Sequence, residues 1–575
     1  MRKYIVILLI FFSPILRKGI GGELLAQDFL GIANSPFAGV TGIDVNPASI
    51  VGSPRKWDIT LFGMNLGVAN SYAGLKKSAL VKDQYGSYPA FNEDDFIDKY
   101  ISRRNNGKPI SVHVALNLSL PSFMFVRKKH KDAFAFTCKS RTYVNVDGVD
   151  ADLVDVALSA STNGSGLDSS FFNRDFSGLK VSVQTMIWNE YGITYGKTIE
   201  ETKNERLNVA GRLKLLQGLY SMYLFLDDVQ YKFYEKDSLL VLSSHVGYGH
   251  STNLEFNQEA IKFGFGGKPS FGLDLGATYE FHGLTDVRSR MSAQANTTPL
   301  QHDYKYKLGF SLQDLGWIKF LKPEHARDFT MEIDQTLNFG SLQGSGDTPL
   351  ADVDDSLNAD YPMDASDNKY RMNLPTLASL QGDYYVGKNV SVSSTFNYAF
   401  QFRNNDNKIH EITNFSVTPR WDWKWLGLYV PLSYNKYSHF RLGASARIGP
   451  LIVGMADILP IISKRDVYGV DMHVMLKVPH IHFKKKNKNP RSNSKFNTSR
   501  EEVKKNPKKK KERTNMPKKD SSPKESRKKK EHNIQPKDRD QKARKHIFPR
   551  VKIFKNKRKH KAKPEKRDTI IYFEL

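Results

Sequence analysis

The sequence contains very little cysteine: Cys138 is the one thiol in a chain of 575 residues. A single cysteine cannot form an intramolecular disulfide. Because no cysteine occurs among the first thirty residues, a lipid anchor on an N-terminal cysteine is excluded as well. An exported chain of this length without disulfides has to be held together by backbone pairing and side-chain packing.

Long apolar runs are also missing. After the first 27 residues, no stretch of about 18 uncharged apolar residues occurs, which excludes helical membrane spans. Residues 1–27 open with two basic residues, continue with an apolar run over residues 4–12 and end in small and polar residues. This order is typical of an export signal, and we predict cleavage near Ala26 or Gln27. A retained anchor or a buried strand is the alternative, because Pro14 ends the apolar run early.

Excess positive charge is confined to the last part of the chain. Residues 484–575 contain 36 basic and 11 acidic residues, whereas residues 1–483 contain 50 and 49. A tail so charged cannot bury a core, and we expect it to be disordered and periplasmic. Because export removes nucleic acid as a partner, we expect the tail to meet an anionic periplasmic partner: the cell wall, a lipid phosphate or an acidic protein. A solvated tail without any partner is the alternative.

Motifs for catalysis and metal binding are lacking. The glycine-rich residues 264–268 are similar to a phosphate loop, but Pro269 stands where Ser or Thr is required. The histidines at 473, 480 and 482 have no cysteine or carboxylate at ligand spacing. The acidic insert at 347–367 lacks the glycine and the terminal glutamate of a calcium loop. We therefore predict no catalytic residue, no metal, no cofactor and no enzyme activity.

Over residues 28–483, apolar and polar residues repeatedly alternate with a period of two. In residues 272–281, Leu, Leu, Ala, Tyr and Phe fall on one side of the chain and Gly, Asp, Gly, Thr and Glu on the other. The polar side is rich in small residues and charges that can pair, which fit a crowded lumen better than a water-exposed face. With strands of ~10 residues, the pattern predicts an all-β fold, a transmembrane antiparallel β-barrel of about 14 strands.

Alternation also assigns charged side chains to the barrel interior. We expect six of them to face the lumen, where charges pair or set selectivity: Arg212, Lys214, Asp274, Glu280, Arg441 and Arg447. For each residue, a purely structural charge network is the alternative. Four long polar inserts are expected to be surface-side loops, at residues 76–108, 147–177, 282–302 and 340–370.

Three tryptophans, Trp421, Trp423 and Trp425, are predicted to share one face of a single strand, opposite polar residues that include Arg420 and Asp422. At a membrane interface, each tryptophan can keep its N–H in water and its ring in lipid. A core-facing row in a large soluble β-protein is the alternative.

Several segments carry a family resemblance. The sequence GIDVNPA at residues 42–48 resembles the Asn-Pro-Ala segment of barrels related to the long-chain fatty-acid transporters, in which an N-terminal stretch enters the lumen. NVAGRLKLLQG at 208–218, GLDLGATYEF at 272–281 and LGFSLQDLGWIKF at 308–320, with residues 418–437 and 441–454, resemble an uncharacterised outer-membrane family of Bacteroidota. The resemblance implies a barrel with both ends in the periplasm and supplies no substrate.

Three functions are consistent with these patterns. The first is an outer-membrane channel or transporter for a hydrophobic or small solute, surrounded by outer-membrane lipid, with Asn46 and Pro47 in a plug-like N-terminal segment. The second is a non-transporting scaffold or tether whose basic tail binds a periplasmic partner. The third is a soluble β-protein with a nucleic-acid-binding tail, which requires both the export signal and the tryptophan row to be misinterpreted.

Overall fold

The computed structural model describes residues 29–81, 99–104, 108–154, 175–282, 304–323, 329–338, 354–359, 368–400 and 409–479, with short gaps inside several of these ranges. All of them belong to the first of two units, residues 1–485. The expected export signal, most of the acidic insert at 347–367 and the basic tail lie outside the described residues.

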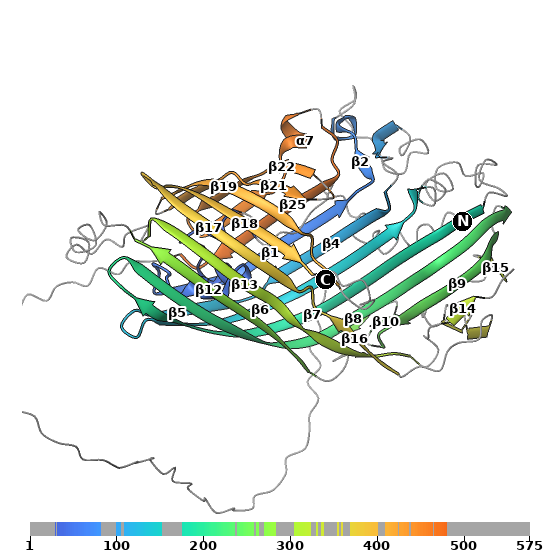
Figure 1. The fold of residues 1–575 in the computed structure, drawn as a ribbon, viewed down its shortest axis with the longest axis horizontal. Coiled ribbons are helices and arrows are strands. Elements are labelled where there is room, and N and C mark those ends of the chain that lie inside the picture. The colour runs from blue at the N-terminus through green and yellow to red at the C-terminus, as the bar shows by residue number, and fades with distance from the viewer. Residues whose placement is uncertain are drawn as a thin grey trace, which may run out of the picture. The chain divides into compact units, whose positions relative to one another are not determined.

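Fourteen antiparallel strand positions form one closed ring, which confirms the predicted fold class (Figure 1). The ring closes because β1 pairs with both β4 and the last strand, β25. In order, it consists of β1 (Trp57–Asn70), β4 (Ile110–Ser119) with β5 (Ser122–Arg127), β6 (Asp132–Val149), β7 (Asp175–Glu201), β8 (Glu205–Glu235), β12 (Ser270–Phe281), β13 (Tyr306–Leu321), β16 (Lys369–Asn373) with β17 (Leu377–Gly387), β18 (Val390–Ala399), β19 (Asn414–Asp422), β20 (Leu426–Tyr429) with β21 (Leu432–Asn435), β22 (His439–Leu442) with β23 (Ala444–Ile448), β24 (Leu451–Met455) and β25 (Gly469–Lys477).

The remaining elements are not part of the ring of fourteen strands. β8 extends past the start of β12 and there pairs with β9 (Ser238–His250), which in turn pairs with β14 (Phe329–Met331) and β15 (Gln335–Asn338). Two further hairpins are β2 (Ala73–Leu75) with β3 (Ile101–Arg103) and β10 (Leu254–Asn257) with β11 (Ala260–Phe263). The short helices are η1 (Gly39–Asp44), η2 (Pro47–Ile50), η3 (Lys77–Leu80) and α7 (Leu459–Ile462). No helix of the described residues is long and apolar enough to cross a membrane.

The two ends of the barrel differ in their connections. One end has short turns, such as the Lys388–Asn389 turn between β17 and β18, where both residues have positive φ as a two-residue hairpin turn requires. We call it the short-turn end and the opposite one the long-loop end. β1 starts and β25 finishes at the short-turn end, so the described chain enters and leaves the barrel on the same side.

Strand directions correct one of the predicted surface loops. The inserts at 76–108, 147–177 and 340–370 do connect strands at the long-loop end. The insert at 282–302 instead joins the end of β12 to the start of β13, and these termini lie at the short-turn end. Alternation along a strand reports which side faces the lumen, but it carries no information on strand direction, so the sequence pattern could not separate the two ends.

The tryptophan row is also corrected. Trp421 lies near the end of β19, whereas Trp423 and Trp425 lie in the turn before β20, so the three do not share a single strand. The chain reverses there because β19 pairs with β20, with Trp421 opposite Leu428. Trp423 and Trp425 are 51% and 58% exposed, while Asp422, which precedes Trp423, is buried. Two of the three tryptophans therefore belong to the turn between β19 and β20, which periodicity alone cannot reveal.

The outer surface of the ring is apolar and the inner surface polar. Large hydrophobic side chains stand exposed on neighbouring strands, among them Leu213, Leu215, Phe271, Leu273, Leu275, Leu308, Phe310, Leu380, Phe396 and Phe415. Their sequence neighbours point inward and are buried, for example Arg212, Lys214, Asp274, Ser311 and Ser379. A soluble protein would bury the apolar face, so the soluble alternative is wrong for this fold.

Candidate functional site

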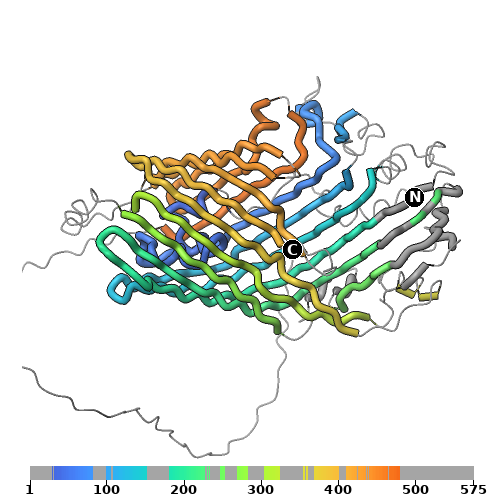
Figure 2. Tube along the Cα trace, in the orientation of Figure 1, coloured from blue at the N-terminus to red at the C-terminus, as the bar shows by residue number. Residues whose placement is uncertain are grey.

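The N-terminal residues 31–56, which we call the plug segment, lie inside the ring. η1 contacts β1 and β5, while η2 contacts β7, β8 and β12. Contacts with strands spread around the ring can be made only from the lumen, and Figure 2 shows this dark-blue segment among the strands at the short-turn end. The apolar residues of the segment pack on the wall, as Ile43 and Ile50 do against Met124 and Ala135.

The Asn-Pro pair starts η2. Asn46 is extended, with φ −156°, and its side-chain oxygen accepts a hydrogen bond from the Ala48 N–H at 2.9 Å. This is a typical helix N-cap, and Pro47 occupies the first helical position, where its missing N–H costs nothing. The local sequence therefore fixes the direction in which the Asn46 amide points.

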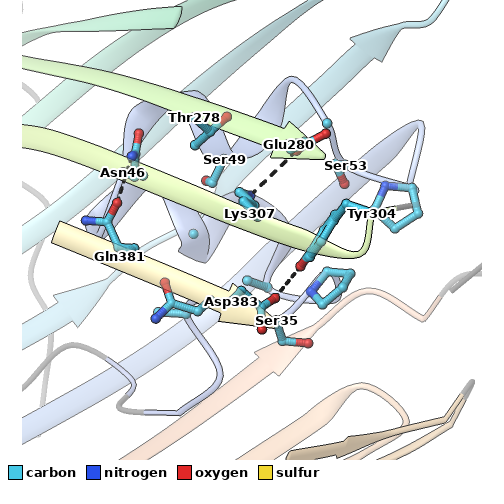
Figure 3. A pocket seen from close by; sticks show the side chains of 18 of the residues that line it. Ser35, Asn46, Ser49, Ser53, Thr278, Glu280, Tyr304, Lys307, Gln381 and Asp383 are labelled. Atoms are coloured by element: carbon cyan, nitrogen blue, oxygen red, sulfur yellow. Dashed lines mark hydrogen bonds and ion pairs between the residues drawn. The ribbon is translucent and has the colours of Figure 1, made fainter. Parts of the chain in front are cut away.

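The amide nitrogen of Asn46 joins the plug segment to three wall strands. It donates to the Ala277 carbonyl on β12 at 3.0 Å, to the Phe310 carbonyl on β13 at 3.2 Å and to Gln381 Oε1 on β17 at 2.9 Å. Glycine is required at 276, because a Cβ there would lie 2.2 Å from Asn46 Oδ1. Figure 3 shows Asn46 and Gln381 facing each other across this contact.

Asp44, at the end of η1, connects the plug segment to charged groups of the wall. Its carboxylate lies 2.7 Å from Lys139 Nζ on β6 and 3.6 Å from the Arg212 guanidinium on β8. All three side chains are buried. Because two buried cations share this one plug carboxylate, Asp44 is the strongest electrostatic link between plug and wall.

Asp44 belongs to a buried layer of charges, which we call the charged layer. Its cations are Lys139, Arg141, Arg212 and Lys214, and its carboxylates are Asp44, Glu190, Asp274 and Asp314. Lys214 lies 2.6 Å from Asp274 and also contacts Asp314. These eight side chains carry four positive and four negative charges, and Arg141 also lies 4.0 Å from the partly exposed Glu411. Each buried charge is compensated only while the others remain in place.

A β-bulge brings Asp314 into the charged layer. The β12–β13 register changes from Leu273 opposite Leu315 to Leu275 opposite Leu312, so that two residues of β13 face Asp274. Asp314 takes the left-handed φ of 56°, and its N–H donates to Asp274 Oδ1 at 2.7 Å. Regular alternation would turn the residue after Gln313 outward, but the bulge turns the Asp314 side chain inward.

Two further ion pairs hold the plug segment at the short-turn end. Asp58 on β1 accepts from Lys477 on β25 at 2.8 Å, from Arg55 at 2.8 Å and from the Val40 N–H at 3.0 Å. Gly39 has a positive φ of 61°, and a Cβ there would lie 2.0 Å from Asp58 Oδ2. The pair that closes the ring between its first and last strands therefore also binds the plug segment.

Arg420 of β19 also joins the plug segment to charged groups of the wall. It lies 2.6 Å from Asp383 and 3.1 Å from Asp422, and it donates to the Asn34 carbonyl at 3.3 Å. The Ser35 hydroxyl donates to Asp422 at 3.0 Å. Arg447 reaches the same carboxylate group at 3.7 Å.

A small polar cavity of about 40 Å³ remains between the plug segment and strands β12, β13 and β17 (Figure 3). Glu280 lies on its wall, 3.0 Å from Arg206 and 3.9 Å from Lys307. A cavity of this volume has room for a few water molecules. It is too small to hold a hydrophobic solute.

Toward the long-loop end, the interior changes from charged to apolar. A cluster of buried residues, which we call the apolar cluster, fills this part of the barrel; it consists of Ala115, Tyr143, Met186, Trp188, Leu216, Tyr223, Ile318, Phe320, Tyr370, Met372, Leu374 and Ile409. Polar groups at its edge anchor the segment that supplies Ile409. His410 Nε2 lies 2.6 Å from Asp147, and the His410 carbonyl accepts from Asn145 at 3.1 Å.

The structure places all six predicted lumen residues on the buried side of the wall. Arg212, Lys214 and Asp274 meet in the charged layer, whereas Glu280 and Arg447 lie near the short-turn end. Arg441 lies on β22, next to the long-loop end. Sequence reasoning missed Asp44, Lys139, Arg141, Glu190 and Asp314. Alternation within β6 and β7 contains the signal for three of them, since Lys139, Arg141 and Glu190 sit at inward positions.

The described residues hold no group of three or more His, Cys, Asp or Glu side chains arranged to bind a metal ion. His473, from the histidine group considered in the sequence, is buried on β25 and packs edge-on against Phe29 of the N-terminal segment at 5.5 Å between ring centroids. The glycine-rich residues 264–268 and the other two histidines lie outside the described residues.

Comparison with known proteins gives a family and several barrels. A profile described as "Family of unknown function (DUF5723)" matches residues 47–457. A comparison with proteins of curated function finds no match. Among solved structures, a Pseudomonas aeruginosa FadL homologue is 9% identical, covers 79% of this chain and 97% of its own, and has a TM-score of 0.35. The Pseudomonas putida toluene transporter TodX is 10% identical, with coverages of 79% and 98% and a TM-score of 0.29.

Proposed function

We propose that this chain, which belongs to DUF5723, a family of unknown function, is an outer-membrane protein that admits a small hydrophobic solute through a plugged, gated lumen. The apolar outer face supports membrane insertion. A transmembrane barrel needs an outward apolar band about 25 Å tall, and the exposed leucines and phenylalanines of neighbouring strands provide it.

The apolar cluster is the observation that supports a hydrophobic solute. Barrels that pass hydrophilic solutes keep a polar, water-filled interior. Here the interior next to the long-loop end is lined by Trp188, Met186, Phe320 and Met372, all almost completely buried. A solute entering from that end would exchange contacts with apolar side chains, which favours transfer of apolar rather than charged molecules.

The plug segment and the charged layer support gating. Together they occupy the lumen between the apolar cluster and the short-turn end, so a solute has to displace side chains to pass. The links that would have to break are polar contacts, among them those of Asn34, Ser35, Asp44, Val45 and Asn46 with the wall. A segment held by non-covalent polar contacts can have a minor, displaced state.

Expression of the full-length chain in cells with an outer membrane tests this function. We expect faster entry of the apolar dye N-phenylnaphthylamine and unchanged entry of the polar β-lactam nitrocefin. The Ala115→Phe variant, which adds a ring to the apolar cluster, should slow dye entry. Ala277→Phe, which adds the same ring to the outward side of β12, serves as its control.

Dye entry equal to that of cells without the protein would refute the transport proposal. So would equal entry with both alanine variants, because the solute would then not pass through the cluster. Recovery in the outer-membrane fraction, with a fast-migrating unheated band on gels, establishes that each variant is folded and inserted.

Tethering is a second candidate, supported by where the last strand ends. β25 ends at Lys477 at the short-turn end, and the 92 residues from Lys484 onward carry the excess positive charge. If short turns face the periplasm as in other outer-membrane barrels, the tail follows on the side where cell wall is available. Binding through lysines to anionic polymers weakens with salt.

We expect the full-length protein to co-sediment with purified cell wall at low salt and to be released at high salt. A chain ending at residue 483 should not sediment, yet it should still allow dye entry. Sedimentation of the shortened chain would contradict tethering, and loss of dye entry would show that the tail serves transport instead.

A further inference from the structure

The outer wall of the barrel carries a groove that the transport proposal does not use. It has a volume of about 520 Å³ and is lined by Leu213 of β8, Phe271 and Leu273 of β12, and Leu315 and Trp317 of β13. Phe271, Leu213 and Trp317 are 63%, 56% and 47% exposed, so the groove opens on the outside of the barrel. Its lining is apolar, as expected of a surface that contacts acyl chains.

The bulge at Asp314 explains why the wall is grooved here. β13 pairs with β17 up to Gln313 opposite Leu377 and with β16 from Trp317 opposite Asn373, with an interruption between them. On the other edge of β13, β12 begins only at Ser270. The last residues of β13 therefore lie beside β8. The same bulge therefore places a carboxylate in the lumen and opens a depression on the outer face.

Three cations lie just beyond the groove on the same outward side. Lys319 of β13 is directly opposite Arg371 of β16, and Lys369 is opposite Leu321, two residues further along. All three cations are exposed. Like charges directly opposite each other destabilise a sheet. Arg371 also lies over the Trp317 ring, 5.5 Å from its centroid, as is common where a wall meets the headgroup region.

We propose that this site binds a phosphate-bearing membrane lipid, with an acyl chain in the groove and the phosphate between Lys319 and Arg371. Going along β13, the outward residues are apolar up to Trp317 and basic at Lys319, and the last one, Leu321, lies opposite Lys369. The change from apolar to basic side chains is the order of acyl chain and headgroup in a leaflet. A bound phosphate converts the repulsion between the two cations into two charge-assisted hydrogen bonds. Lys369 adds a third positive charge to the rim.

The proposal depends on membrane insertion of the barrel but not on solute transport, and binding can be measured without transport. Native mass spectrometry of the full-length protein in detergent, titrated with dioleoylphosphatidylglycerol, should give saturable binding of one lipid. Dioleoylphosphatidylcholine, which is zwitterionic, should bind more weakly, and inorganic phosphate alone should neither bind detectably nor compete.

The double variant Lys319→Gln/Arg371→Gln should bind phosphatidylglycerol about 30-fold more weakly, since each cation near a membrane surface contributes about 1 kcal/mol. Leu213→Trp, which fills the groove from an exposed position, should also weaken binding. Lys128→Gln/Lys197→Gln removes the same charge from exposed positions at the short-turn end and is the matched control.

Equal loss in the control double variant would overturn the proposal, because binding would then follow net charge. Equal binding of phosphatidylcholine would contradict the proposed recognition of an anionic lipid by the cations. Competition by inorganic phosphate would mean that the site binds anions and not a lipid. If the wild-type chain binds lipid as expected but cells expressing it take up no more dye than cells without it, transport fails while the lipid site stands.

Discussion

Replacing Glu190 by alanine is expected to lower the free energy of unfolding of the barrel by about 3–5 kcal/mol, the usual cost of removing one member of a buried ion-pair network. Glu190 lies 2.9 Å from Arg212 and 3.4 Å from Arg141, and its side chain is 1% exposed. Without it, the charged layer carries an excess positive charge that water cannot reach.

Urea unfolding of detergent-solubilised protein, followed by tryptophan fluorescence and by gel mobility, measures this loss. Glu201→Ala is the matched control because Glu201 lies on the same strand and pairs with Lys131 at 2.7 Å, but at 32% and 55% exposure. Its removal should cost at most about 1 kcal/mol, as for other surface pairs. Similar losses in the two variants would mean that the charged layer is hydrated and contributes little to stability.

The double variant Asp44→Ala/Asn46→Ala is expected to turn a silent barrel into a conducting one. It removes the plug carboxylate shared by Lys139 and Arg212 and the amide that reaches three wall strands. Loss of about 4 kcal/mol of anchoring would raise the ratio of displaced to seated plug by about 10³. Lys139, freed from Asp44, would then favour a hydrated lumen.

Single-channel recording in planar bilayers checks this expectation. The wild-type chain should show rare, brief openings, and the double variant should show long-lived conductance with an unchanged heat-modifiable band on gels. Asn34→Ala removes one plug contact, the 2.6 Å hydrogen bond to Thr395, and should stay close to wild type. A silent double variant would mean that the apolar cluster, which also fills the lumen, keeps the barrel closed without the plug segment.

The strand pattern could be predicted from the sequence because a membrane imposes it residue by residue. On β12, Leu273 and Leu275 face outward and Asp274 and Thr278 face the lumen, as alternation requires. Strand lengths could not be predicted in this way. β7 and β8 run for 27 and 31 residues, well beyond the ~10 residues needed to cross the bilayer, because their outer parts pair with each other and with β9.

The polar side of each strand and the confinement of the excess positive charge to the tail could be predicted from the amino-acid sequence alone. These properties depend on neighbours within a few residues of each other. The folded barrel was needed to show that Asp44, Glu190 and Asp314 share one charged layer, that the 282–302 insert joins strands at the short-turn end, and that a bulge forms a groove in the outer wall. Those features depend on strand register and direction, since pairing brings together residues more than a hundred positions apart, such as Lys214 and Asp314.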